Sequence, residues 1–254
     1  MSYRRKMIKL PVQTAVKIDW GKPVMVIIFG LFVCIHAAQV TRYTANLRQL
    51  SSLGAFGLVH HSLILCFYAL LVAAYWTRPP AKIASRSPVA RLAAVVATIL
   101  PFALPFVSTA SDQMSVVVLG NCLAIAGLGF TVYALQALGR NISIIPQARS
   151  LVQSGPYRLL RHPLYAGELM TTFGIVVARP GIGAAAVLLG LAVLQVYRAR
   201  QEEEVLETTF PEYRTYALRT PRFIPGCAPV KRRLQIADDQ LVANALELRS
   251  IEKA

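Results

Sequence analysis

The sequence predicts an all-α fold, a polytopic bundle of five to six transmembrane helices, and three observations lead to this prediction. First, 55% of the 254 residues are hydrophobic, only 15% are charged and the mean hydropathy is +0.50. Soluble domains carry about 25% charged residues. Second, the apolar residues form long uncharged stretches. Third, the basic residues are distributed unevenly between the loops that join these stretches.

The uncharged stretches define the expected spans. Four of them have roughly the 20 residues that a helix needs to cross a bilayer. Two more are shorter and are separated only by Arg179 and Pro180, which predicts a tight helical hairpin. In chain order, the six stretches lie at 23–41, 55–77, 92–111, 115–139, 163–178 and 181–197.

The distribution of basic residues predicts the topology. If the N-terminus is cytoplasmic and there are six spans, all but three of the 27 Lys and Arg residues fall on the cytoplasmic side. The exceptions are Arg42, Arg48 and Arg179. Such asymmetry sets orientation in membrane proteins with short loops. The net charge of +15 is therefore interpreted as a topology signal that also attracts anionic lipids, and no nucleic-acid partner is expected.

We therefore expect a multi-pass protein of a bacterial cytoplasmic membrane with both termini inside. The sequence leaves the oligomeric state open. Its chemistry is concentrated in the second half, where polar residues and prolines begin at Gly139 and continue to about Pro225. We expect a folded loop before Pro163, irregular chain after Pro211, and an amphipathic surface helix over 231–254.

Two polar clusters lie at the ends of the predicted hairpin, GPYRLLRHPLYAGE at 155–168 and YRARQEEEVLETTF at 197–210. His162 and Tyr165 are three residues apart, so they share a face if both are helical. Glu168 is an ionisable residue within an apolar run, which marks a functional candidate. Each cluster alone also fits a plain role, as an interfacial anchor or a solvated helix face. Because the hairpin brings both clusters to one membrane face, together they predict a site.

Other motifs point to structural roles. GLGFTV at 127–132 resembles the start of a dinucleotide fingerprint, but it lacks the third Gly and fits a helix–helix contact better. The pair His60 and His61 is expected to be hydrogen-bonded within the bundle, and its role stays open. The four cysteines are scattered, so neither a disulfide framework nor a metal site is predicted.

The order and spacing of the two clusters carry a family resemblance. GPYR-x-x-RHPLY-x-G, then EE-x-x-L-x-x-x-F-x-x-Y-x-x-Y and PR-x-IP, resembles the isoprenylcysteine carboxyl methyltransferases and their phospholipid methyltransferase relatives. The likeness covers roughly 138–226. It implies an integral membrane enzyme that uses S-adenosylmethionine and methylates a lipophilic acceptor taken from the bilayer. Carboxyl O-methylation is expected, with phospholipid or amine N-methylation as the alternative.

The resemblance also implies roles for individual residues. Arg198 is expected at the acceptor and Glu202 beside it as the second catalytic residue. The run of three acids from Glu202 leaves the register of the family's acidic pair open by one, and Pro211 stands where the family usually has Gly. The expected cofactor-binding residues are Gln147, Leu151, Val152, Tyr157, His162, Pro163, Leu164, Tyr165, Glu202 and Glu203.

We therefore expect N-terminal spans over 1–137, a methyltransferase core with the cofactor-binding region over 138–226, and a tail over 227–254. Two other classes of protein remain as alternatives. An NADPH-dependent sterol-type reductase resembles the same region, but Leu164 and the Gln201-Glu202-Glu203 run favour methyl transfer. A lipid-binding membrane protein without activity would keep the spans and bind no cofactor.

Overall fold

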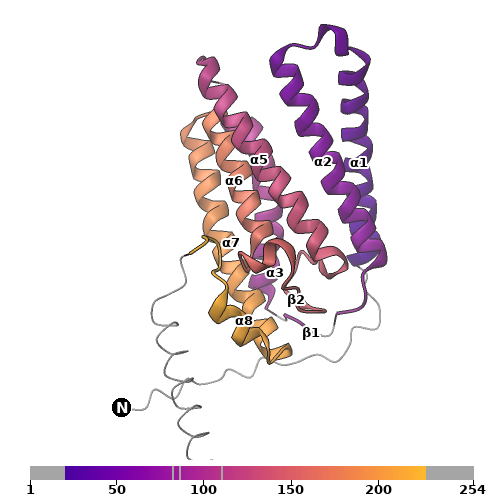
Figure 1. The fold of residues 1–254 in the computed structure, drawn as a ribbon, viewed down its shortest axis with the longest axis vertical. Coiled ribbons are helices and arrows are strands. Elements are labelled where there is room, and N and C mark those ends of the chain that lie inside the picture. The colour runs from indigo at the N-terminus through magenta and orange to yellow at the C-terminus, as the bar shows by residue number, and fades with distance from the viewer. Residues whose placement is uncertain (1–20, 82, 86, 110, 227–254) are drawn as a thin grey trace, which may run out of the picture.

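The computed structural model describes residues 21–226 except positions 82, 86 and 110, and within them the chain is predominantly helical (Figure 1). The expected tail helix over 231–254 lies outside the described residues. The α-helices are α1 (Gly21–Ala45), α2 (Ser52–Thr77), α3 (Pro88–Ile99), α4 (Leu104–Val107), α5 (Met114–Leu138), α6 (Pro163–Ala178), α7 (Ile182–Thr209) and α8 (Tyr213–Arg219). The 3-10 turns η1 (Leu47–Gln49), η2 (Leu100–Ala103), η3 (Gly139–Asn141) and η4 (Gly155–Arg158) join them.

The helix lengths confirm the predicted all-α transmembrane bundle. Among the described residues, five helical segments are long and apolar enough to cross a membrane, and α6 is a shorter apolar helix of 16 residues. The third of these segments, Pro88–Val107, is not one regular helix. It passes from α3 through η2 into α4, because Pro101 and Pro105 each lack the N–H that an α-helix requires.

Close packing of α5 against α6 forms the centre of the bundle (Figure 1). A Cβ atom added at Gly120 would lie 2.6 Å from the carbonyl oxygen of Gly174, and one at Gly127 would lie 2.9 Å from the carbonyl carbon of Met170. Only glycine therefore permits this approach, as small residues do at membrane helix interfaces. The GLGFTV motif is thus a helix–helix contact, as the sequence favoured.

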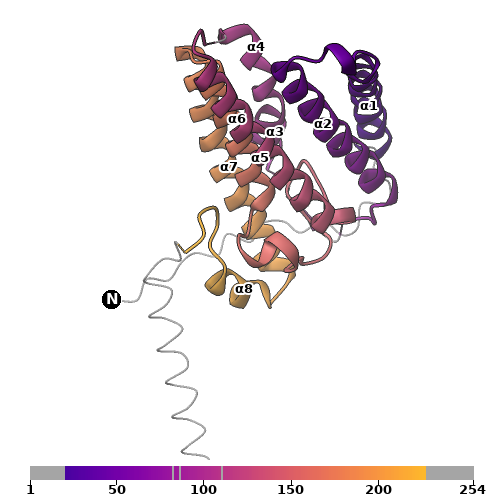
Figure 2. The same cartoon turned by 45° about the horizontal axis from the view of Figure 1, so that its top comes forward.

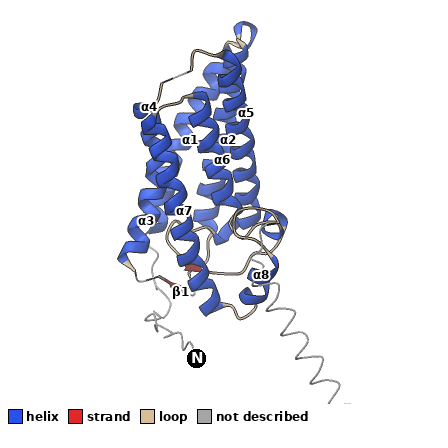
Figure 3. Cartoon of the chain, turned by 90° about the vertical axis from the view of Figure 1, so that its left-hand side faces the viewer, coloured by secondary structure: helices blue, strands red, loops and turns tan. Residues whose placement is uncertain are grey.

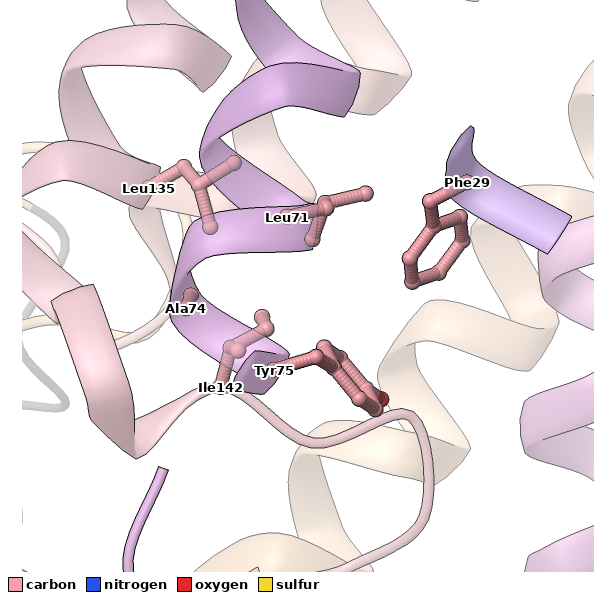
Figure 4. Packing of buried hydrophobic residues seen from close by; sticks show 6 residues of the cluster. All are labelled: Phe29, Leu71, Ala74, Tyr75, Leu135 and Ile142. Atoms are coloured by element: carbon pink, nitrogen blue, oxygen red, sulfur yellow. The ribbon is translucent and has the colours of Figure 1, made fainter. Parts of the chain in front are cut away.

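A second helix pair, α1 with α2, packs beside α5 (Figure 2). Phe29 of α1, Leu71 and Tyr75 of α2 and Leu135 of α5 belong to one buried cluster (Figure 4). The Tyr75 hydroxyl accepts a hydrogen bond of 3.1 Å from the backbone N–H of Ile144. This cluster therefore fixes the start of the loop that follows α5.

The predicted hairpin is also confirmed, and α7 extends far beyond its apolar part. The turn at Arg179 and Pro180 separates α6 from α7, and α7 continues to Thr209. At that end of the bundle, the two-residue strands β1 (Ile83–Ala84) and β2 (Gln147–Ala148) pair antiparallel and lie near α8 (Figures 1 and 3). The two polar clusters of the sequence therefore reach the same end of the molecule.

The chain after Pro211 differs from the irregular segment that the sequence predicted. Residues Tyr213–Arg219 form α8. Tyr213, Tyr216 and Ala217 are buried against Val205 of α7 and its neighbours, so their spacing of three and four is that of an amphipathic helix. The prediction was wrong here because only a short helix carries this pattern, between Pro211 and Pro221.

Candidate functional site

A small cavity of about 100 Å³, lined by both polar and apolar side chains, lies at the end of the bundle where α5, α6, α7 and α8 meet. Of the expected cofactor-binding residues, all line it except Pro163 and Glu203. Arg198 does not line it either. The lining residues that sequence reasoning missed are Leu138, Asn141, Ile142, Ser143, Ile145, Arg149, Ser150, Arg161, Leu206, Tyr213 and Tyr216.

The start of α6 places two aromatic rings at this cavity. His162 is the N-cap and Pro163 follows at the first helical position, where its missing N–H is not needed. The rings of His162 and Tyr165 stack with centroids 5.5 Å apart and planes 6° apart. Phe223 lies on the His162 ring at 5.8 Å. Pro163 is itself buried and contributes the turn that orients these rings, not a cavity wall.

Glu203 is a buried anchor for the loops around the cavity. Its Oε1 accepts hydrogen bonds from His162 Nε2 at 3.1 Å and from Arg222 Nε at 2.9 Å, and its Oε2 accepts one from Arg222 Nη2 at 2.5 Å. Arg161 Nη1 lies 2.9 Å from the same Oε1 as an ion pair without the alignment of a hydrogen bond. The hydrogen bonds that Arg222 donates to Glu203 raise the pKa of Arg222. This carboxylate is thus surrounded by cations.

The backbone strengthens the same connection. The N–H of Arg161 donates to the carbonyl of Pro221 at 2.8 Å, and the N–H of His162 donates to that of Arg222 at 3.2 Å. These hydrogen bonds hold the PR-x-IP segment alongside the RHP segment. Glu203 of α7 contacts side chains of both segments.

Glu202 occupies a different environment from its neighbour. It lines the cavity and accepts a hydrogen bond from the Tyr165 hydroxyl. Its Oε2 lies 3.8 Å from His162 Nδ1. Since a carboxylate can only accept, His162 Nε2–H donates to Glu203, and Nδ1 of a neutral ring is then an acceptor on the side of Glu202. The two acids thus differ in their surroundings, since Glu202 lies at the cavity and Glu203 lies among the arginines.

Three buried tyrosines, one from η4 and two from α8, line the cavity. The Tyr216 hydroxyl donates to the carbonyl of Tyr157 at 2.6 Å and so holds the GPY turn. Burial raises the pKa values of Tyr157, Tyr213 and Tyr216. All three therefore stay neutral phenols at physiological pH.

The loop after α5 supplies a polar wall. Gln147 Oε1 accepts hydrogen bonds from Arg149 Nη2 at 2.7 Å and from Ser143 Oγ at 3.1 Å. Ser150 Oγ donates to Asn141 Oδ1 at 2.6 Å. The family likeness begins at about residue 138, so it includes this loop, but among these polar side chains it implied a role only for Gln147.

Arg198 lies behind the cavity, separated from it by Tyr165. Its guanidinium carbon is 4.6 Å from the centre of the Tyr165 ring. Nη1 donates to Gln195 Oε1 at 3.3 Å and Nη2 to the carbonyl of Ile144 at 3.2 Å, while the buried Nε–H has no hydrogen-bond partner. Gln195 Nε2 in turn donates to Glu168 Oε2 at 2.5 Å. Arg198 and Glu168 thus form one polar chain through Gln195, a residue that sequence reasoning missed although a glutamine within an apolar run is itself a signal.

The intramembrane histidines lie apart from this site, between α1 and α2. His61 Nδ1 and His36 Nδ1 are 2.9 Å apart, the distance of a hydrogen bond, so the hydrogen-bonding partner of His61 is His36. The His60 ring meets that of His61 edge-on with centroids 5.8 Å apart.

The fold and this site define an integral membrane protein that carries a polar, carboxylate-containing cavity at one end of its helical bundle. Residues 115–213 match the sequence model of the phospholipid methyltransferase family. This stretch contains both polar clusters, and its match to a family of membrane methyltransferases confirms, for this part of the chain, the resemblance found in the sequence.

Individual relatives align over shorter stretches. The cobalt-zinc-cadmium resistance protein CzcN of Cupriavidus metallidurans is 42% identical over 77 residues, 30% of this chain and 36% of that protein. The nickel-cobalt-cadmium resistance protein NccN of Alcaligenes xylosoxydans xylosoxydans is 38% identical over 80 residues, 31% of this chain and 38% of that protein. The chain thus spans little more than a third of the length of either relative.

A solved structure, that of the eukaryotic intramembrane Ras methyltransferase (isoprenylcysteine carboxyl methyltransferase), is similar with a TM-score of 0.44 and 21% identity. The superposition covers 68% of this chain and 66% of that one.

Proposed function

We propose that the protein is an S-adenosylmethionine-dependent methyltransferase that acts on a lipophilic acceptor. The observation that carries the proposal is the cavity where α5, α6, α7 and α8 meet, because eight of the ten residues expected around the cofactor line it. They come from the loop after α5, from α6 and from α7, and only the fold brings them together.

The chemistry of the cavity fits this cofactor. Glu202 offers a carboxylate and Tyr165 an aromatic ring, and both favour a cation. Asn141 and Ser150 offer donors and acceptors for polar groups of the cofactor. The enclosed volume of about 100 Å³ is below the roughly 300 Å³ at which ligand pockets begin, so the loop walls must open or the cofactor must extend across the open side.

Arg198 is the residue that we assign to the acceptor, with a carboxylate as the group that it recognises. The bound sulfonium supplies an electrophilic methyl group, so a carboxylate needs no general base to accept it. The site has to orient the acceptor and exclude water, and such positioning contributes several kcal/mol. Arg198 suits this task because it is buried and keeps one N–H donor without a partner. A guanidinium binds carboxylates or phosphates well.

Amine N-methylation is the second candidate, and a specific observation favours it. Glu168 places a carboxylate in the polar chain behind Tyr165. An ammonium acceptor must lose a proton before it can take a methyl group, and Glu168 or Glu202 is placed to accept it. The description of the matching family also names a phospholipid methyltransferase.

Transfer of labelled methyl groups tests the proposal. Purified protein in lipid nanodiscs is incubated with methyl-labelled cofactor and with prenylated carboxylates, fatty acids or aminophospholipids. We expect base-labile methyl esters on the carboxylates. Base-stable methylamine products would replace the first candidate by the second. Absence of any methylated product across the panel would contradict the proposed function.

We further propose that the site faces the cytoplasm of a bacterial cell, on the basis of the basic residues counted above. In a background without the native cysteines, Asp112→Cys and Glu212→Cys place single probes in exposed loops at opposite ends of the bundle. A membrane-impermeant reagent should label intact cells at 112 and not at 212. The reverse pattern would refute this orientation.

A further inference from the structure

α7 buries a glutamine completely in the apolar part of the bundle. The exposed fraction of Gln195 is 0%. Its amide oxygen accepts from Arg198 Nη1 at 3.3 Å and its amide nitrogen donates to Glu168 Oε2 at 2.5 Å. A primary amide has one accepting end and one donating end. Gln195 therefore satisfies a cation and an anion at the same time, and keeps them one amide group apart.

The separation matters because opposite charges in a membrane interior attract strongly. Without the amide between them, Arg198 and Glu168 would form a direct pair, since the low dielectric strengthens their attraction. A carboxylate commonly takes two guanidinium donors at once. Such a pair would occupy the donors of Arg198, whereas the observed chain leaves its Nε–H without a partner.

We propose that Gln195 is a positioning residue for methyl transfer: it holds Arg198 away from Glu168 and so keeps a guanidinium donor available to the acceptor. The inference rests on the proposed function insofar as Arg198 meets the acceptor. It extends that function because it assigns a role in acceptor binding to a neutral residue. This residue lies outside the cavity and outside the family motifs.

The test compares Gln195→Leu, Glu168→Gln and the double variant, with Gln136→Leu as the matched control on the exposed face of α5. With a prenylated carboxylate as acceptor, Gln195→Leu should raise its KM about tenfold, because the acceptor then competes with Glu168 for a charge-assisted hydrogen bond. The affinity for S-adenosylhomocysteine should not change. Glu168→Gln added to Gln195→Leu should restore most of the acceptor affinity.

Recovery by a second substitution distinguishes positioning from packing, because a packing defect at Gln195 would not be repaired by a change at Glu168. If Gln195→Leu does not fold, Gln195→Met serves in its place, since it keeps the length and removes the hydrogen bonds. An unchanged acceptor KM, or a loss that Glu168→Gln does not repair, would overturn the inference.

A second measurement needs no activity. In wild-type protein, Glu168→Gln should barely change the melting temperature in detergent, because an amide oxygen can still accept from Gln195. In the Gln195→Leu background, Glu168→Gln should lower the melting temperature by several degrees, because it breaks the new ion pair with Arg198. Equal effects in the two backgrounds would overturn the inference. If no acceptor is methylated but the two effects differ, the proposed function fails and the arrangement of Gln195 stands.

Discussion

Neutralising two adjacent acids, Glu202 and Glu203, should have opposite consequences, and the structure sets the size of each. Glu203 is buried against Arg161, His162 and Arg222, so Glu203→Gln leaves buried cations without their shared anion. Removing one partner of a buried ion pair costs about 3–5 kcal/mol. Because the Arg222 side chain is 29% exposed, the lower end, about 3 kcal/mol, is expected here.

Glu202→Gln should instead leave stability nearly unchanged. Its side chain is 22% exposed and a glutamine still accepts from the Tyr165 hydroxyl, so the loss should stay below about 1 kcal/mol. Cofactor affinity should fall roughly ten- to a hundredfold, the range for a lost hydrogen bond to a charged group of about 1.5–3 kcal/mol. Thermal unfolding and calorimetric titration with S-adenosylhomocysteine measure both effects. If Glu202→Gln were the unstable variant and Glu203→Gln the one that binds weakly but folds well, the assignment of the two acids would be refuted.

Changes at four further positions test other parts of the structure. Arg198→Ala should lower the turnover of an anionic acceptor about ten- to a hundredfold and leave cofactor affinity intact. Arg198→Lys should recover part of this turnover, because it keeps the charge. Comparison of kcat and KM for the two variants checks both expectations. His162→Ala should weaken cofactor binding in calorimetry whatever the acceptor, and unchanged affinity would remove it from the site. Gly174→Leu should abolish recovery of folded protein in size-exclusion chromatography, because α5 and α6 touch there, and a monodisperse variant would contradict that packing. Tyr75→Phe should lower the free energy of unfolding by about 1 kcal/mol, because it removes the hydrogen bond with the N–H of Ile144. Unchanged stability in thermal unfolding would show that other contacts hold this loop.

The transmembrane architecture could be predicted because long apolar stretches admit few other structures in a lipid bilayer. The hairpin was predictable for the same reason, since Arg179 and Pro180 interrupt an otherwise continuous run. The break within Pro88–Val107 was less evident, because Pro101 and Pro105 lie in residues as apolar as the rest. Hydropathy indicates that a segment lies in lipid, but it does not indicate whether the backbone of that segment forms one regular α-helix.

The candidate site was predictable only where a residue type carries its own signal. His162 and Tyr165 stand out in sequence, and the structure places them together at the cavity. The difference between Glu202 and Glu203 was not predictable, because adjacent helical residues point about 100° apart and their surroundings depend on where α6 and the PR-x-IP segment lie. The role of Gln195 depends on its hydrogen bond to Glu168, which lies on another helix. This contact forms only in the folded protein, so the sequence alone did not predict it.

Calorimetric titration of the wild-type protein with S-adenosylmethionine, S-adenosylhomocysteine and NADPH shows which cofactor the cavity binds. We expect saturable binding of the first two at one site per chain and no binding of NADPH. Binding of NADPH alone would indicate the reductase. Binding of none of the three would indicate a membrane protein without this activity.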